Sequence, residues 1–249
     1  MQKMLLLASV STVALVIAGN ANSADFPRKA PSMVAATAPY SWTGCYVGAH
    51  VGWGWGHQNV TQSTSSFTGG GATASAGLDS SGGLFGGQVG CNYQFAGSWV
   101  AGVQGDLAAA DINGRADDGT GTDSTIAVKT DWIASVTGRL GMTAWNDRTL
   151  FYVKGGVAWD HNQWDLHDAV QFYNPSQLSE TRSGWTVGGG VEWAFVANWS
   201  AFAEFNYYDF GGGTNFTQTS GSTTNTFSTG SQTIETAKIG VNYKFYGGN

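Results

Sequence analysis

A two-residue alternation between residues 84 and 95 constrains the fold of this chain more than any other feature. Apolar side chains share one parity, and glycines and amide side chains share the other. Because successive side chains of a β-strand point to opposite faces, the pattern predicts a strand with one apolar and one polar face. The apolar set is Phe85, Val89, Cys91, Tyr93 and Phe95, and the polar set is Gly86, Gln88, Gly90, Asn92 and Gln94.

The same alternation recurs along the chain in segments of about 10 residues or more, the length that a tilted strand needs to cross a bilayer. An even number of strands can close into a barrel that has no exposed edge. We therefore predict an all-β fold, an eight-stranded antiparallel transmembrane β-barrel. The eight predicted strands cover residues 40–55, 82–95, 98–111, 130–143, 150–162, 182–195, 199–209 and 233–245.

The connections between these segments alternate in length. Those after the second, fourth and sixth strands are short, at 96–97, 144–149 and 196–198, and the others are long and rich in Ser, Thr, Gly and Asn. This predicts short periplasmic turns and long extracellular loops, with both termini in the periplasm. The low-complexity loops 61–83 and 211–232 fit either solvated, mobile surface or a role in adhesion or antigenic exposure, and the sequence leaves both interpretations open.

Alternation alone does not decide which face points outward, because a soluble lipocalin-like barrel encloses its apolar face. Only 11 % of the residues are charged, whereas tryptophan occurs 11 times. Low charge suits a lipid-facing surface better than a soluble one. Aromatic residues on the apolar face lie toward the strand ends, as interfacial girdles require. We therefore place the apolar face in lipid and keep the soluble barrel as the alternative.

The N-terminal segment has the features of a secretory signal peptide. Lys3 precedes an apolar run over residues 4–18, and small residues follow at 21–24. We predict a signal peptide over residues 1–24, a flexible periplasmic leader over 25–39, and one barrel domain over 40–249. The formal net charge of −6 argues against nucleic acid as a partner.

Charged residues on the polar face are predicted to fill the barrel interior as ion pairs. An unpaired charge in a narrow lumen is costly, so each is expected to have a partner. A proton or ion pathway is the alternative interpretation. From their heights above the short turns, the predicted pairs on adjacent strands are Asp106 with Arg139, Lys154 with Glu192, and Glu204 with Lys238.

The two cysteines, Cys45 and Cys91, lie on the outward parity of adjacent predicted strands, and their midpoint at residue 68 falls within the first long loop. They could therefore face each other, and the periplasm permits a disulfide. Directly opposed strand residues often have poor geometry for the bond. We therefore favour two small lipid-facing residues, with a disulfide as the alternative.

Four histidines are candidate ligands. His50 falls on the inward parity and is predicted to fill the lumen, whereas His57, His161 and His167 lie in or beside long loops. Loop histidines could ligate haem iron or a metal, but near aspartates they are more often simply solvated. No nucleophile lies beside a base at a recognisable spacing, so we expect no catalytic residue, no metal site and no cofactor.

Two motifs at the ends of the barrel segment resemble a known family. Residues 42–48 read Trp-Thr-Gly-Cys-Tyr-Val-Gly, and residues 239–245 read Ile-Gly-Val-Asn-Tyr-Lys-Phe. They resemble the first and last strands of the alphaproteobacterial outer-membrane immunogenic, opacity-like porin family, within the OmpA-type β-barrel superfamily. Cys45 stands where that family usually has Phe. The resemblance implies an eight-stranded barrel in the cell outer membrane that performs no catalysis.

From these observations we expect a structural, surface-exposed role in the Gram-negative cell envelope. A porin-like channel for small solutes is one alternative, and a haemin or other ligand receptor acting through the loops is another. The expected partners are outer-membrane lipid, lipopolysaccharide and, during insertion, the barrel-assembly machinery. The chain is expected to be a monomer that binds no nucleic acid.

Overall fold

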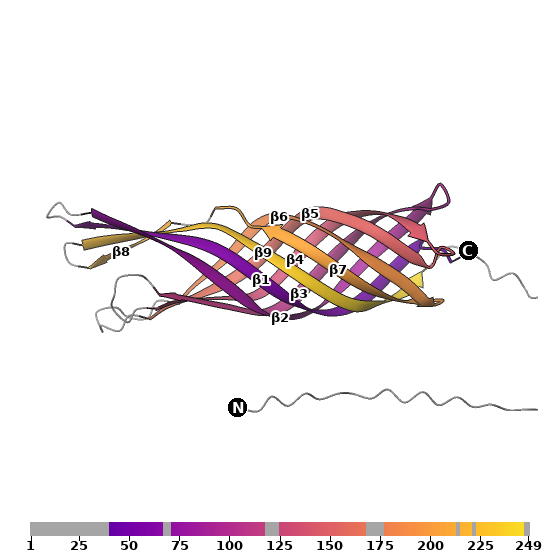
Figure 1. Ribbon diagram of the computed structural model, residues 1–249, viewed down its shortest axis with the longest axis horizontal. Helices are drawn as coiled ribbons and strands as arrows, with labels where there is room; N and C mark the ends of the chain where they lie inside the picture. Colours follow the sequence, from indigo (N-terminus) through magenta and orange to yellow (C-terminus); the bar gives the residue numbers. More distant parts are fainter. Residues whose placement is uncertain are drawn as a thin grey trace, which may run out of the picture. The chain divides into compact units, whose positions relative to one another are not determined.

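The computed structural model describes residues 40–66, 71–117, 125–167, 177–212, 215–220 and 223–246, almost all of them in strands (Figure 1). The predicted signal peptide 1–24 and leader 25–39 lie outside these residues. The strands are β1 (Gly44–Ser66), β2 (Gly71–Phe95), β3 (Trp99–Asp117), β4 (Thr125–Ala144), β5 (Thr149–His167), β6 (Gln177–Val196), β7 (Trp199–Asp209), β8 (Asn215–Ser220) and β9 (Thr223–Tyr246).

The sheet closes on itself. Strands β1 to β7 pair antiparallel in chain order, β7 pairs with β9, and β9 pairs with β1. The short strand β8 pairs with residues 223–228 of β9, and β7 pairs with residues 233–243 of the same strand. Because β8 follows β7 in the chain, the two count as one interrupted strand beside β9. Among the described residues the barrel therefore has eight strand positions, which confirms the predicted eight-stranded antiparallel all-β fold.

The strands extend well beyond their predicted ends at the side of the long connections. The prediction that 61–83 and 211–232 are loops is wrong for residues 61–66, 71–83, 215–220 and 223–232, which lie in strands, whereas residues 211–212 lie in none. The β1–β2 ladder continues as far as Ser65 opposite Gly71, and β8 pairs with β9. The ladder depends on backbone hydrogen bonds, which side-chain polarity does not interrupt. Beyond the bilayer no lipid requires an apolar face, so the alternation that marks a strand in the sequence stops before the strand does.

The apolar parity points outward along every barrel strand. Phe85 is 67 % exposed, whereas inward-facing charged residues such as Asp106 are almost fully buried. The alternative of a soluble barrel, in which the apolar face would line the lumen and the polar face would meet water, is therefore wrong. Tryptophans frame the apolar belt, with Trp99 and Trp199 near the short turns and Trp159 toward the other end. No helix in the described part of the chain is long and apolar enough to cross a membrane.

The two cysteines form a disulfide, so the favoured prediction of two unbridged residues is wrong. Cys45 on β1 lies directly opposite Cys91 on β2, with their Cα atoms 4.0 Å apart. The residue numbers of every β1–β2 pair share the predicted midpoint of 68. Closely opposed Cα atoms in an antiparallel pair bring the two sulfurs together, contrary to the geometric argument against a bridge. The bond staples β1 to β2 on the outer wall near the short turns.

Candidate functional site in the barrel lumen

A closed ring of hydrogen bonds spans the lumen toward the short-turn ends of the strands. Tyr46 Oη donates to Gln104 Oε1 at 2.9 Å. Gln104 Nε2 donates to Gln88 Oε1 at 3.0 Å, and Gln88 Nε2 donates to Asn242 Oδ1 at 2.7 Å. Asn242 Nδ2 donates to Glu192 Oε1 at 2.8 Å. Arg139, on β4, closes the ring.

Arg139 makes two of these bonds at once. Its Nη2 donates to Glu192 Oε2 at 2.7 Å, and its Nη1 donates to Tyr46 Oη at 2.8 Å. The guanidinium carbon also lies 4.1 Å from the ring centroid of Tyr152, a cation–π contact. The ring joins β1, β2, β3, β4, β6 and β9. Six strands are therefore tied together across the lumen by side chains, in addition to the ladder between neighbours.

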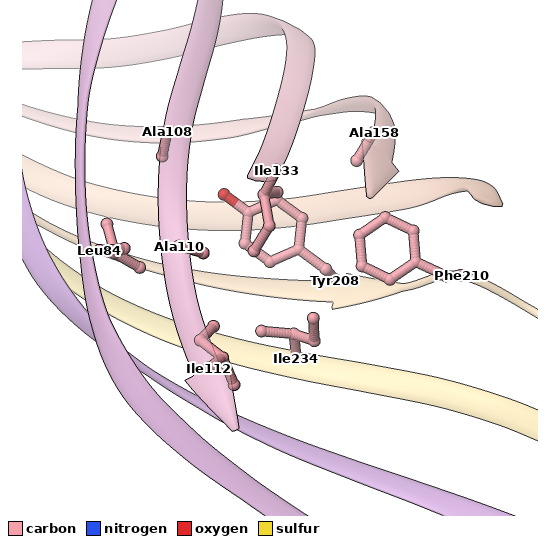
Figure 2. Close-up of a cluster of buried hydrophobic side chains, with 9 residues drawn as sticks. All are labelled: Leu84, Ala108, Ala110, Ile112, Ile133, Ala158, Tyr208, Phe210 and Ile234. Carbon is pink, nitrogen blue, oxygen red and sulfur yellow. The ribbon is translucent and has the colours of Figure 1, made fainter. Parts of the chain in front are cut away.

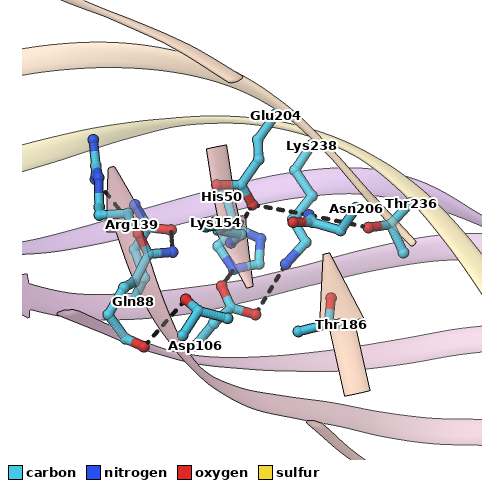
Figure 3. Close-up of polar contacts among 12 residues, drawn as sticks. His50, Gln88, Asp106, Arg139, Lys154, Thr186, Glu204, Asn206, Thr236 and Lys238 are labelled. Carbon is cyan, nitrogen blue, oxygen red and sulfur yellow. Dashed lines mark hydrogen bonds and ion pairs between the residues drawn. The ribbon is translucent and has the colours of Figure 1, made fainter. Parts of the chain in front are cut away.

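Two further ion pairs lie beside this ring (Figure 3). Lys154 Nζ lies 2.6 Å from Glu204 Oε1, and Lys238 Nζ lies 2.9 Å from Asp106 Oδ1. The second oxygen of Asp106 is 2.8 Å from His50 Nε2, so His50 fills the lumen as predicted. The six charged residues of the three pairs are each at most 6 % exposed. The interior is therefore charged but internally compensated.

The predicted membership of this site is confirmed, but the predicted partners are wrong. The observed pairs are Arg139–Glu192, Lys154–Glu204 and Lys238–Asp106, and they join strands two or three positions apart. They replace the predicted Asp106–Arg139, Lys154–Glu192 and Glu204–Lys238.

The physical reason is the stagger of neighbouring strands in a tilted barrel. Asp106 lies opposite Ser135, four residues from Arg139 along β4, and Lys154 lies opposite Gly188, four residues from Glu192. Four residues correspond to about 13 Å along a strand. Glu204 does lie opposite Lys238, but each of the two side chains reaches inward to a different partner.

Apolar side chains pack in the lumen on both sides of the charged layer. Near the short turns, Trp42 packs with Val100, Leu150, Tyr152 and Ala194. Trp42 Nε1 donates to the carbonyl oxygen of Asp147 at 2.8 Å, and this bond holds the indole at the short-turn end of the lumen. Toward the long hairpins a larger cluster faces inward (Figure 2). Its members are Leu84, Ala108, Ala110, Ile112, Ile133, Ala158, Tyr208, Phe210 and Ile234.

Glycines opposite Tyr46 and Tyr152 leave space for the two tyrosine side chains in the lumen. Tyr46 pairs with Gly90 across the β1–β2 ladder, and a Cβ added at Gly90 would lie 2.5 Å from Tyr46 Oη and 2.7 Å from the carbonyl oxygen of Val103. Tyr152 pairs with Gly190 in the same way. The inward glycines are therefore required by close approach of side chains and neighbouring strands.

Gly90→Ala is expected to destabilise the barrel by about 1–3 kcal/mol, because the new methyl group displaces Tyr46 from the ring. Gly138→Ala is the matched control, since a Cβ at Gly138 meets nothing within 4 Å. It should change the free energy of unfolding by less than about 0.5 kcal/mol. Urea titrations of both variants in phospholipid vesicles measure the difference, and equal effects would contradict this role of Gly90.

The candidate histidine ligands are not brought together. His57 on β1 lies with Nδ1 2.7 Å from Asp79 Oδ1, and His161 on β5 stacks on Trp132 with ring centroids 5.9 Å apart. Strands β1 and β5 are four positions apart in the eight-position barrel, so one iron cannot take both. His167 ends β5, but its side chain lies outside the described part of the structure. In that part, no three His, Cys, Asp or Glu side chains are grouped as a metal site.

Sequence reasoning missed the uncharged members of the ring and the indole of Trp42. Tyr46, Gln88, Gln104 and Asn242 share the inward parity, but a parity assigns a face and not a partner. One signal was available, because the midpoint of residue 68 already places Tyr46 opposite Gly90. A large polar side chain that faces a glycine on the neighbouring strand has room to extend over that glycine and across the lumen.

A closed barrel with an apolar outer belt and a charged, hydrogen-bonded interior defines the class of strand-spanning outer-membrane proteins. Residues 30–245 match the outer membrane protein β-barrel domain family, and the chain belongs to this family. It lies in the cell outer membrane. In such barrels the short turns face the periplasm and the long hairpins face the cell exterior.

Similar proteins agree with this assignment. The chain is 31 % identical over 245 residues to the 31 kDa outer-membrane immunogenic proteins of Brucella melitensis and Brucella suis, covering 95 % of this chain and 98 % of each of those. Its fold is similar to the outer membrane protein OprG of Pseudomonas aeruginosa, with a TM-score of 0.54 and 17 % identity. That likeness covers 83 % of this chain and 98 % of OprG.

Proposed function

We propose that this protein is a closed, non-catalytic barrel with a structural role in the outer membrane. It exposes its long hairpins at the cell surface and does not conduct solutes. The observation that carries the proposal is the hydrogen-bonded ring across the lumen. A conducting pore needs a continuous water-filled path, whereas an eight-stranded barrel has an interior just wide enough for side chains. Here those side chains bond to one another.

The layers on either side of the ring support the same proposal. Trp42 and its neighbours cover the periplasmic side, and the cluster around Tyr208 and Phe210 covers the extracellular side. An ion crossing the lumen would have to leave water for these apolar layers, at a cost of many kcal/mol. The porin-like alternative therefore requires both layers and the ring to rearrange.

The surface available for recognition is the set of long hairpins and the outer wall. We propose that the barrel acts as a monomer in contact with outer-membrane lipid and lipopolysaccharide, after insertion by the barrel-assembly machinery. No observation in the described residues favours the haemin receptor, since His57 and His161 lie on opposite walls.

Liposome swelling tests the absence of solute conduction. Vesicles carrying the purified barrel are expected to swell in arabinose or glucose no faster than protein-free vesicles, while vesicles carrying an open general porin swell rapidly. Swelling that scales with the amount of folded barrel and falls with the size of the sugar would support the porin-like alternative instead.

A further inference from the structure

A shallow pocket lies on the outer wall, just beyond the extracellular edge of the apolar belt. Its volume is about 490 Å³. Strands β9, β1, β2 and β3 contribute its walls, so it is separate from the lumen and from the hydrogen-bonded ring. Its lining includes the side chains of Trp55, His57, Asp79, Ser81, Asn113 and Glu235.

The strand register builds this pocket. Trp55 on β1 lies between Glu235 on β9 and Ser81 on β2, and Ser81 in turn lies opposite Asn113 on β3. All four residues carry the outward parity, so their side chains form one row across four neighbouring strands. His57 lies opposite Asp79 one pleat farther from the belt.

The pocket combines an aromatic face with groups that exchange hydrogen bonds. Trp55 is 47 % exposed, which leaves its indole available at the base of the polar row. The amide of Asn113, the hydroxyl of Ser81 and the carboxylate of Glu235 provide donors and acceptors beside it. A few placed polar groups around an aromatic surface are the general makeup of a small-ligand site.

The charges around the pocket disfavour an anionic ligand. The imidazole of His57 already faces Asp79 at 2.7 Å, and Lys129, opposite Asn113 on β4, lies 3.5 Å from Asp111. Carboxylates therefore outnumber free cationic groups among these residues. Neutral hydroxyl groups can bond to carboxylates and amides without this repulsion, and the C–H face of a sugar ring suits the electron-rich face of an indole.

We propose that this pocket binds a saccharide, with Trp55 stacking on the sugar ring and Asn113 and Glu235 bonding to its hydroxyls. The pocket lies at the level where the sugars of an outer-leaflet glycolipid begin, directly beyond the tryptophans of the belt. A soluble saccharide from the exterior offers the same chemistry. The two sources differ only in whether an acyl chain is attached.

The test compares three probes by calorimetry in a detergent that has no sugar headgroup: an uncharged diglycosyl diacylglycerol, the same molecule fully deacylated, and phosphatidylethanolamine. Trp55→Ala is expected to weaken binding of both sugar-bearing probes by about tenfold, since it removes the stacking surface. Asn113→Ala should weaken both several-fold, and neither variant should alter phosphatidylethanolamine binding. Stronger binding of the acylated probe identifies the glycolipid as the source, and equal binding identifies a soluble saccharide.

Trp185→Ala is the matched control, because Trp185 is 50 % exposed at the same edge of the belt on β6. It should change the affinity for either sugar-bearing probe by less than about twofold. The proposal is overturned if the deacylated probe does not bind the unaltered protein, or if Trp185→Ala weakens binding as much as Trp55→Ala does. Gel mobility of the folded barrel before heating verifies that each variant has folded.

Discussion

Arg139→Ala is expected to lower the free energy of unfolding by about 3–5 kcal/mol, because it leaves the carboxylate of Glu192 buried without its cation. Glu192 is 2 % exposed and keeps its bonds from Ser200 and Asn242, neither of which carries a charge. The change also opens the ring at Tyr46. Urea titration in phospholipid vesicles, followed by tryptophan fluorescence, measures the loss.

Lys129→Ala is the control for this variant. Lys129 is also ion-paired, to Asp111 and Asp131 at 3.5 and 3.6 Å, but its side chain is 48 % exposed. Removing an exposed pair should cost about 1 kcal/mol or less. A loss for Arg139→Ala no larger than that for Lys129→Ala would mean that the lumen charges are hydrated rather than buried.

A double-mutant cycle separates the observed pairing from the one that strand heights suggested. Arg139 should couple strongly to Glu192 and only weakly to Asp106, since residues that share no contact give nearly additive effects. Stronger coupling of Arg139 to Asp106 would contradict the partners described above.

Replacing both cysteines by alanine is expected to lower the free energy of unfolding by about 2–4 kcal/mol, because the Cys45–Cys91 bond limits the unfolded chain. Unfolding the unaltered protein in urea with a reductant should produce the same loss. The doubly substituted protein should respond to urea identically with and without reductant. If reductant leaves the unaltered protein unchanged, the two thiols are not bonded in the folded barrel.

The strand positions and the inward parity follow from the sequence because a bilayer imposes both. Every spanning strand must present apolar residues to lipid, so a period of two is visible wherever the belt runs, as at Phe85 and Val89. Beyond the belt that constraint ends, and the β1–β2 ladder continues through residues 61–65 with no apolar signal. Strand ends beyond the belt therefore could not be predicted.

The partners within the lumen could not be predicted for a different reason. They depend on the stagger between strands, which no single strand encodes. The β1–β2 midpoint could be placed because the two cysteines gave it, and it was confirmed. For β3 and β4 no such marker exists, and counting from the turns missed the four-residue offset between Asp106 and Arg139. Pairing across the lumen also joins strands that share no ladder, such as β4 and β6.

Recording from planar bilayers containing the purified, folded protein tests the central claim of a sealed lumen most directly. The sealed arrangement of the ring and its two apolar layers predicts a flat baseline in molar salt, with no discrete current steps across applied voltages of either sign. Stable steps of one reproducible size, present only with folded protein and absent from detergent controls, would contradict it.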